Sequence, residues 1–139
     1  MKIRRAAVSA MLEHARNDQP NECCGFLLGT LDTIEEVTRA TNLTPSPNRY
    51  QADPRDHFGV IRQARREGSS VLGVYHSHPA APPVPSASDL THATYVEYVY
   101  VIVSLLQAPV VDQIQAYRLT GGQFKPVELV VEDEEIEER

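Results

Sequence analysis

The sequence predicts an α/β domain in which a mixed β-sheet is flanked by helices. Helical and strand-like segments follow one another in the order helix, strands, helix, strand, helix, strands, which is typical of this class. The chain has 139 residues, of which 42% are hydrophobic and 23% charged, as in a single soluble domain with its own core. No repeat or linker divides it. We therefore expect one domain over residues 1–131 and an acidic, flexible tail over residues 132–139.

The first half of the chain predicts one helix and two strands. Apolar residues recur at helical spacing over residues 3–17. The apolar run from Cys24 to Leu28, closed by Gly29, predicts a buried strand. Residues 33–41 are rich in Thr, Val and Ile and predict a second strand. A polar loop with two prolines, residues 42–51, follows.

A second helix and a third strand are predicted in the middle of the chain. Asp53 and Pro54 form a helix start, with an acidic cap and a proline in the first turn, and Gly68 is a stop signal. Residues 71–78 then read as a strand. The segment 79–85 is proline-rich and therefore excludes both a helix and an interior strand.

The last third predicts a short helix over residues 87–95 and three strands. Residues 98–105 and 113–119 are strongly β-forming. The glycine pair at 121–122 predicts a hairpin turn into a final strand over residues 124–131.

Charge and composition exclude several classes of partner. The formal net charge is −6, but six acids and one Arg lie in the last eight residues, so the rest is close to neutral. The absence of a basic stripe argues against nucleic acid. No apolar run has the length of a membrane span, and the N-terminal pattern is unlike a signal peptide. Adjacent Cys23 and Cys24 suit a reducing compartment, with Cys24 as a small buried side chain. We expect a cytoplasmic protein without membrane contact.

The chemistry-bearing segment is His76-Ser77-His78, at the end of a predicted strand. Side chains two apart on a strand point to the same face, so both imidazoles project together and suit a zinc ion. The next good donor is the carboxylate of Asp89. Two His and one Asp leave a fourth position open for water, which is the pattern of a catalytic zinc. Such an ion lowers the pKa of its water toward neutrality.

A zinc hydrolase also needs a carboxylate that moves protons without ligating the metal. Glu22, at the mouth of a buried strand, qualifies, and Ser86 is a candidate hydrogen-bond donor to an oxyanion. Each residue also has a simpler interpretation. Ser86-x-x-Asp89 matches a helix capping box, Glu22 by itself is most often a solvated acid, and an isolated His-x-His arises by chance.

Taken together, these residues resemble a known signature. Glu22 is followed by His76-Ser77-His78-Pro79, six residues, Ser86, two residues and Asp89. This is similar, without any substitution or change of spacing, to the JAMM signature of the MPN (JAB1/Mov34/PAD-1) metallopeptidase family. The segments ECCGFLLG, SPNRYQADP, GVYHSHP and YVIVSL also resemble the stand-alone bacterial branch of that family.

The resemblance implies a role for each motif residue. His76, His78 and Asp89 would hold one zinc ion per chain, Glu22 would be the base that activates water, and Ser86 would donate to the transition state. The implied architecture is the MPN/JAB fold, similar to that of cytidine deaminases. The deaminase signature itself is absent, which disfavours base deamination.

The resemblance also implies a substrate. Family members hydrolyse an amide or isopeptide bond after the C-terminal Gly-Gly tail of a ubiquitin-like or sulfur-carrier protein, and such a tail can lie extended in a narrow groove. The short stretch between Glu22 and His76 favours a small carrier over a polyubiquitin chain. Two alternatives stay open. One is a non-catalytic MPN scaffold or binding module, and the other is a zinc hydrolase of a small-molecule amide.

The remaining candidate residues have simpler interpretations. His14, His57 and His92 lie on predicted helices without ligand partners, and we expect none of them in the site. Tyr75 alternates with the two motif histidines and is expected to pack on the other side of the sheet. The loop Asn48-Arg49-Tyr50 is similar to that of the bacterial branch and is a candidate for substrate contact.

Overall fold

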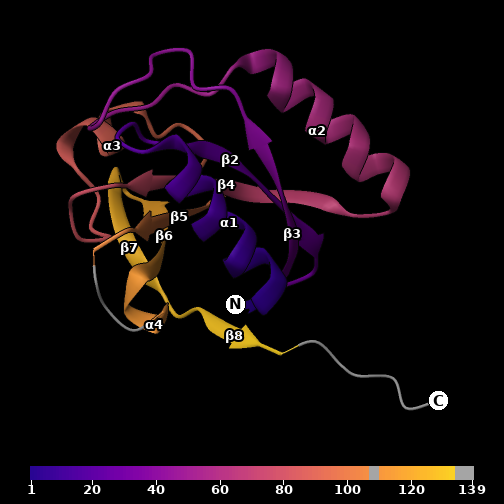
Figure 1. Cartoon of the computed structure of the whole chain (residues 1–139). Coiled ribbons are helices and arrows are strands. Elements are labelled where there is room, and N and C mark those ends of the chain that lie inside the picture. The colour runs from indigo at the N-terminus through magenta and orange to yellow at the C-terminus, as the bar shows by residue number, and fades with distance from the viewer. Residues whose placement is uncertain (107–109, 134–139) are drawn as a thin grey trace.

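The structure is a computed structural model that describes residues 1–106 and 110–133. A single sheet forms its centre. Helix α1 (Arg5–Asp18) and helix α2 (Pro54–Glu67) lie on opposite faces of this sheet (Figure 1). None of the described helices is long and apolar enough to cross a membrane. The α/β class with flanking helices is confirmed.

Eight strands make up the sheet. In chain order they are β1 (Lys2–Arg4), β2 (Cys24–Thr30), β3 (Thr33–Ala40), β4 (Ser70–His78), β5 (Val99–Ser104), β6 (Ile114–Thr120), β7 (Gln123–Val127) and β8 (Val130–Glu132). The short helices α3 (Ala87–His92) and α4 (Val110–Gln113) lie between strands. The order across the sheet is β7-β6-β5-β4-β2-β3-β1-β8. Because β1 is parallel to both neighbours and β4 is parallel to β5, the sheet is mixed, as predicted.

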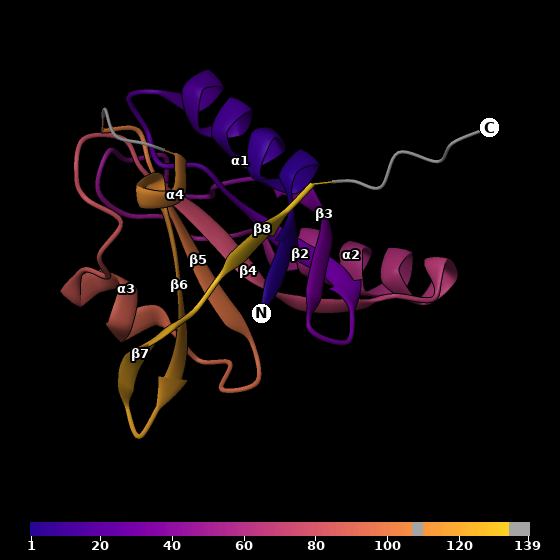
Figure 2. The same cartoon turned by 90° about the horizontal axis from the view of Figure 1, so that it is seen from below.

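The two edge strands of the sheet, β7 and β8, are consecutive in the chain. Only Glu128 and Leu129 separate them, so the sheet has to curl until its opposite edges approach each other (Figure 2). The prediction of one uninterrupted strand over residues 124–131 is therefore wrong. The chain crosses from the β7 edge of the sheet to the β8 edge because Leu129 and Val131 then pack against the core beneath α1.

Two further elements differ from the prediction. Residues 2–4 form β1 instead of joining the first helix, since Ile3 is completely buried and pairs with Ile34 of β3. Helix α4 was not predicted, because four residues are too few to show a helical period.

The end of the chain is described only in part. Glu132 closes β8, and its carboxylate lies 3.6 Å from Lys2 Nζ. The rest of the predicted acidic tail, residues 134–139, lies outside the described residues. The division of the chain at residue 131 stays a prediction.

Each face of the sheet has its own hydrophobic core. The side chains of β4 alternate between them, so that Val74, His76 and His78 share the α2 face while Tyr75 enters the core beneath α1. There the Tyr75 hydroxyl lies 2.7 Å from His14 Nδ1. The position predicted for Tyr75 is confirmed. The α1-side core includes Ile3, Met11, Leu27, Ile34, Tyr75 and Val101, and the α2-side core consists of Phe26, Leu28, Val60, Ala64, Val74 and Tyr100.

Helix α2 begins and ends as its sequence predicts. The Asp53 carboxylate accepts a hydrogen bond of 2.9 Å from the backbone N–H of Arg55, and Pro54 occupies the first turn. Gly68 follows the last turn with φ of 72°, a left-handed conformation that favours glycine. The N-terminus of this helix also fixes the preceding loop, because the backbone N–H of Thr41 donates to the Asp56 carboxylate at 2.7 Å.

Candidate metal centre

His76 and His78 project together from the end of β4. The two rings have centroids 5.0 Å apart, and their Nε2 atoms are separated by 3.2 Å. Both side chains are buried, because β4 is an interior strand between β2 and β5. The strand periodicity therefore correctly placed both imidazoles on one face.

Asp89 reaches the two histidines from helix α3. Its Oδ1 lies 3.2 Å from His76 Nε2 and its Oδ2 lies 3.1 Å from His78 Nε2. The carboxylate is buried as well. One ligand atom from each of these three residues lies within 4.8 Å of the others, so the fold brings together the three predicted ligands.

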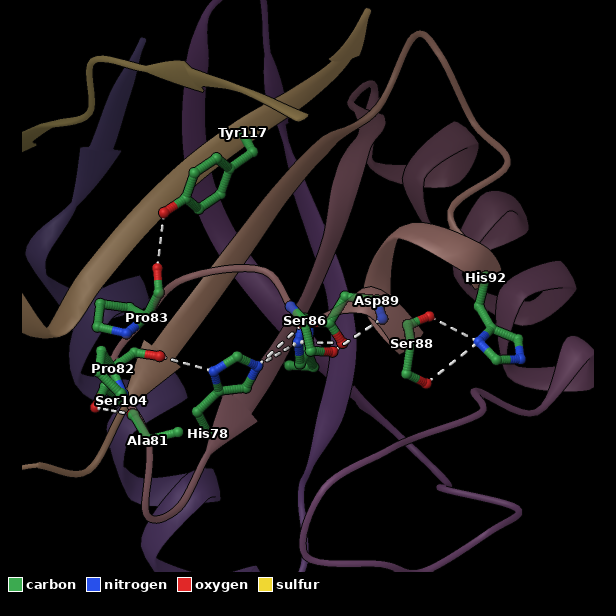
Figure 3. Close-up of polar contacts among 11 residues, drawn as sticks. His78, Ala81, Pro82, Pro83, Ser86, Ser88, Asp89, His92, Ser104 and Tyr117 are labelled. Carbon is green, nitrogen blue, oxygen red and sulfur yellow. Dashed lines mark hydrogen bonds and ion pairs between the residues drawn. The ribbon is translucent and has the colours of Figure 1, made fainter. Parts of the chain in front are cut away.

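The hydrogen bond from His78 to Pro82 leaves the other ring nitrogen of His78, Nε2, available to bind a cation. Its Nδ1 lies 2.8 Å from the carbonyl oxygen of Pro82, which can only accept, so Nδ1 carries the proton (Figure 3). In neutral His78 the lone pair of Nε2 then faces the Asp89 carboxylate. Imidazole nitrogens and a carboxylate oxygen converging in a buried site fit a divalent ion such as zinc.

The pKa values of the cluster favour the ionised acid. Burial raises the pKa of the Asp89 carboxyl, but hydrogen bonds from His76 and His78 outweigh it and hold that pKa well below its usual range. Burial lowers the pKa of His76. For His78 burial acts in the same direction, yet the hydrogen bonds to Asp89 and Pro82 raise its pKa. Asp89 is therefore a carboxylate that can ligate a metal.

Glu22 lies just before β2 and is almost completely buried, at 3% exposure. The pKa of its carboxyl is raised to about 8, chiefly by burial, while His78 lowers it and Asp89 raises it. Its Oε1 has no hydrogen-bond partner among the described residues. The interpretation of Glu22 as a solvated surface acid is therefore wrong. A buried carboxyl whose pKa is displaced this far from the ordinary value of a Glu is typical of groups that transfer protons.

Ser86 takes part in the helix cap. Its hydroxyl accepts a hydrogen bond of 3.0 Å from the Asp89 backbone N–H, and the Asp89 carboxylate accepts one of 2.9 Å from the Ser86 backbone N–H. This is a capping box, so the alternative interpretation of the Ser-x-x-Asp spacing is correct. It does not compete with the metal site, since the same Asp89 also faces both histidines. Among the described residues the Ser86 hydroxyl donates to no acceptor, so its proton can serve a substrate atom.

The chain that carries this cluster matches a known protein family. The family of prokaryotic homologs of the JAB domain matches residues 4–120, most of the chain and every residue of the cluster. The chain belongs to this family. It is therefore a prokaryotic-type member of the JAMM/MPN metallopeptidases, as the motif resemblance implied.

Relatives of this JAB protein are named a desampylase and a CysO-cysteine peptidase. It is 33% identical to the desampylase of Haloferax volcanii over 133 residues, which cover 91% of this chain and 92% of the relative. It is 35% identical to the CysO-cysteine peptidase of Mycobacterium tuberculosis over 132 residues, which cover 92% and 90%. The JAB protein is an enzyme of the JAMM-type peptidase class.

Solved structures confirm the MPN/JAB fold. A protein from Desulfitobacterium hafniense superposes with a TM-score of 0.87 at 33% identity, over 96% of this chain and 94% of that one. A JAB1/MPN domain protein from Archaeoglobus fulgidus superposes with a TM-score of 0.62 at 25% identity, over 94% and 98%.

The other histidines of the JAB protein lie outside the cluster of His76, His78 and Asp89. His14 bonds to Tyr75 in the opposite core, and His57 Nε2 lies 2.8 Å from the Tyr98 hydroxyl. His92 donates from Nδ1 to the carbonyl of Ser88 in its own helix at 2.8 Å. Among the described residues, the three cluster ligands are the only group of His, Cys, Asp and Glu arranged to hold a metal.

Cys24 faces the same side as His76, its partner across β2 and β4. Burial raises the pKa of its thiol to about 12, so it is protonated at neutral pH. Because the thiolate is the nucleophilic form, burial leaves Cys24 mainly in the less reactive thiol form. This agrees with the sequence-based expectation.

A cavity of about 500 Å³ adjoins the cluster. Its floor belongs to the α2-side core, at Phe26, Val74 and Tyr100. Tyr50, whose ring stacks on His76, and Ser88, next to Asp89, connect it to the ligands. The sequence does not predict this stacking, although it makes the Asn48-Arg49-Tyr50 loop a candidate for contact with substrate.

Proposed function

We propose that this JAB protein is a zinc-dependent peptidase acting on small ubiquitin-like or sulfur-carrier proteins. It hydrolyses the amide or isopeptide bond that follows their C-terminal Gly-Gly tail. The observation that carries the proposal is the convergence of three ligand atoms within 4.8 Å beside the buried carboxyl of Glu22, whose Oε1 has no hydrogen-bond partner among the described residues. One cluster of three ligands corresponds to one ion per chain.

The proposed metal ligands are His76, His78 and Asp89. When bound, zinc lowers the pKa of a coordinated water toward neutrality and polarises the scissile carbonyl. The protein prepares this site by burying all three side chains and by fixing the tautomer of His78 through Pro82. These three side chains would supply three ligand atoms to the ion.

Glu22 is the proposed general base. Its Oε1 takes a proton from the attacking water and passes it to the nitrogen of the leaving amine as the C–N bond breaks. The backbone of Glu22 is fixed for this role, because its N–H donates to the Ser46 carbonyl at 2.8 Å and its carbonyl accepts from Asn42 Nδ2 at 3.1 Å. Ser86 donates its free hydroxyl proton to the carbonyl oxygen as negative charge develops there.

The substrate class is supported by the relatives and by the motif. One relative is named a CysO-cysteine peptidase and another a desampylase, and each matches this chain over about nine tenths of both lengths. The JAMM signature resembles that of peptidases acting after Gly-Gly tails. A tail without side chains can lie extended where bulkier residues would not fit.

A cleavage assay tests the proposal. Zinc-loaded protein is incubated with ubiquitin-like sulfur-carrier proteins, each extended by a short peptide after its Gly-Gly end, and the products are weighed by mass spectrometry. We expect cleavage after the second glycine, and no cleavage when both glycines are replaced by leucine. Hydrolysis of small amides but of no fusion would favour a small-molecule hydrolase, and zinc binding without hydrolysis of either would favour a scaffold.

A further inference from the structure

We propose that Tyr50 is the positioning residue for His76, whose imidazole it holds by face-to-face stacking. The inference rests on the proposed role of His76 as a metal ligand. It assigns to the loop between β3 and α2 a function in preparing the metal site, besides any contact with substrate.

The two histidines are held in different ways. His78 donates from Nδ1 to the Pro82 carbonyl at 2.8 Å, the usual arrangement by which a metal-binding imidazole is oriented. His76 has no such bond, since its Nδ1 is buried and has no hydrogen-bond partner among the described residues. Among the described residues, no hydrogen bond to Nδ1 holds the His76 ring in place. Another contact therefore has to orient it.

Tyr50 supplies that contact. Its ring lies 4.4 Å from the His76 ring between centroids, with an angle of 21° between the planes. This is a stacked pair, in which turning the imidazole about its bond to Cβ would force it into the phenol ring. Tyr50 itself is half-buried and lines the cavity beside the cluster. The stack limits the rotation of His76 while its Nε2 faces Asp89.

The loop is braced so that Tyr50 can act as a fixed wall. Asn42 Oδ1 accepts the backbone N–H of Gln51 at 2.9 Å, and the Leu43 N–H donates to the Gln51 carbonyl at 2.8 Å. Asn42 also donates from Nδ2 to the carbonyl of Glu22. One asparagine thus ties the residue after Tyr50 to the backbone of the proposed base. Loop, base and metal ligand form one connected unit.

Zinc affinity tests the role without any need for turnover. We compare Tyr50→Leu, which removes the ring, with Tyr50→Phe, which keeps it, and with Tyr95→Leu as a matched control. Tyr95 is another ring of the same cavity, but its ring contacts are with His57 and Tyr98. Affinity is measured by competition with a chelator, and each apo-protein is unfolded in urea to establish that it is folded in the assay.

We expect Tyr50→Leu to bind zinc about tenfold more weakly, the lower range for loss of a group that orients a ligand. Tyr50→Phe and Tyr95→Leu should stay within about twofold of the wild type. A folded Tyr50→Leu protein with wild-type affinity, or an equal loss in Tyr95→Leu, would overturn the inference. If wild-type protein itself binds no zinc, the proposed function fails, and this inference with it.

A second measurement covers the case in which Tyr50→Leu does not fold. In NMR spectra of the wild-type apo-protein, the ring current of a stacked Tyr50 should shift the carbon-bound ring protons of His76 upfield relative to those of His78. Tyr50→Phe should keep this shift. Ring protons of His76 at ordinary positions would mean that the stack is absent in solution, and the inference would be wrong.

Discussion

The carboxylate of Asp89 accepts the backbone N–H of Ser86 at 2.9 Å through Oδ2, the same atom that lies 3.1 Å from His78 Nε2. One side chain thereby starts helix α3 and completes the proposed ligand set. Since the capping box fixes the rotamer of Asp89, the carboxylate is already aimed at the histidines before any metal binds. The cap is part of how the site is built.

Replacement of Asp89 separates its two roles. In Asp89→Asn the amide oxygen can still accept from Ser86, but the negative charge is lost, so we expect near-normal stability without zinc and loss of most bound metal. Asp89→Ala should lose metal as well as about 1 kcal/mol of stability with the cap. Metal content after dialysis and urea unfolding of the apo-proteins measure the two effects. Unchanged zinc content in Asp89→Asn would mean that Asp89 caps the helix but does not bind the metal.

Glu22→Gln removes the proposed base while keeping its shape. Because Glu22 is not among the clustered ligands, zinc content should stay at the wild-type level. Turnover of a Gly-Gly-tailed fusion should fall by about 10²- to 10⁴-fold, the usual contribution of a positioned acid–base group. Zinc analysis and product mass spectrometry on the same preparation check both statements. A rate near that of the wild type would assign the base to another residue.

Ser86→Ala tests whether the serine acts in catalysis as well as in the cap. Loss of the cap should cost about 1 kcal/mol of stability, and loss of an oxyanion donor should slow the chemical step about a hundredfold. Ser86→Thr keeps a hydroxyl and should retain most of both. Single-turnover rates and urea unfolding provide the comparison. A stability loss with an unchanged rate would restrict Ser86 to the cap.

Sequence alone could predict those parts of the site that depend on local geometry. His76 and His78 follow from the two-residue period of a strand, and Asp89 from its spacing in the motif. The burial of Glu22 could not be predicted in this way, because no residue near it in the chain indicates that the loop with Asn42 and Ser46 will pack against it. The contacts of Glu22 with Asn42 and Ser46 span twenty residues or more, which a local pattern does not encode.

The fold, too, could be predicted where it depends on local patterns and not where it depends on contacts between distant residues. The periodic segments became the predicted helices and strands, and Asp53 and Gly68 bounded α2 as their residue types require. The change of edge between β7 and β8 was missed, since residues 124–131 have one continuous β-forming pattern. Only the closure of the curled sheet determines that Leu129 and Val131 belong to the opposite edge. The Tyr50–His76 stack was missed because it depends on how the loop before α2 folds against β4, which no local pattern encodes.

His14 should make the apo-protein sensitive to acid. Its pKa is lowered by burial and by Arg39, against the opposing effect of Asp18. As pH falls below about 6.5, the unfolded chain takes up a proton that folded His14 resists, so stability is lost between 6.5 and the lower pKa of the folded state. His14→Gln should therefore lose less stability than the wild type between pH 7.5 and 5.5. Urea unfolding at both pH values measures this difference, and equal losses would contradict it.

Two glycines offer a matched pair for testing how the sheet supports the site. A Cβ on Gly59, within helix α2, would meet nothing within 4 Å, whereas one on Gly73 in β4 would clash with the carbonyl oxygen of Val99 in β5. Gly59→Ala should stabilise the protein by roughly 0.5–1 kcal/mol, because alanine loses less backbone entropy in a helix. Gly73→Ala should destabilise it by about 3 kcal/mol or more, since β4 and β5 have to separate.

The two variants should also differ at the metal site. His76 lies three residues beyond Gly73 on the same strand, so a displaced β4 should move the imidazole away from Asp89 and weaken zinc binding. Gly59→Ala lies on the outer helix and should leave zinc affinity unchanged. Urea unfolding and chelator competition measure both properties. A Gly73→Ala protein as stable as the wild type would mean that the close approach of β4 and β5 does not hold in solution.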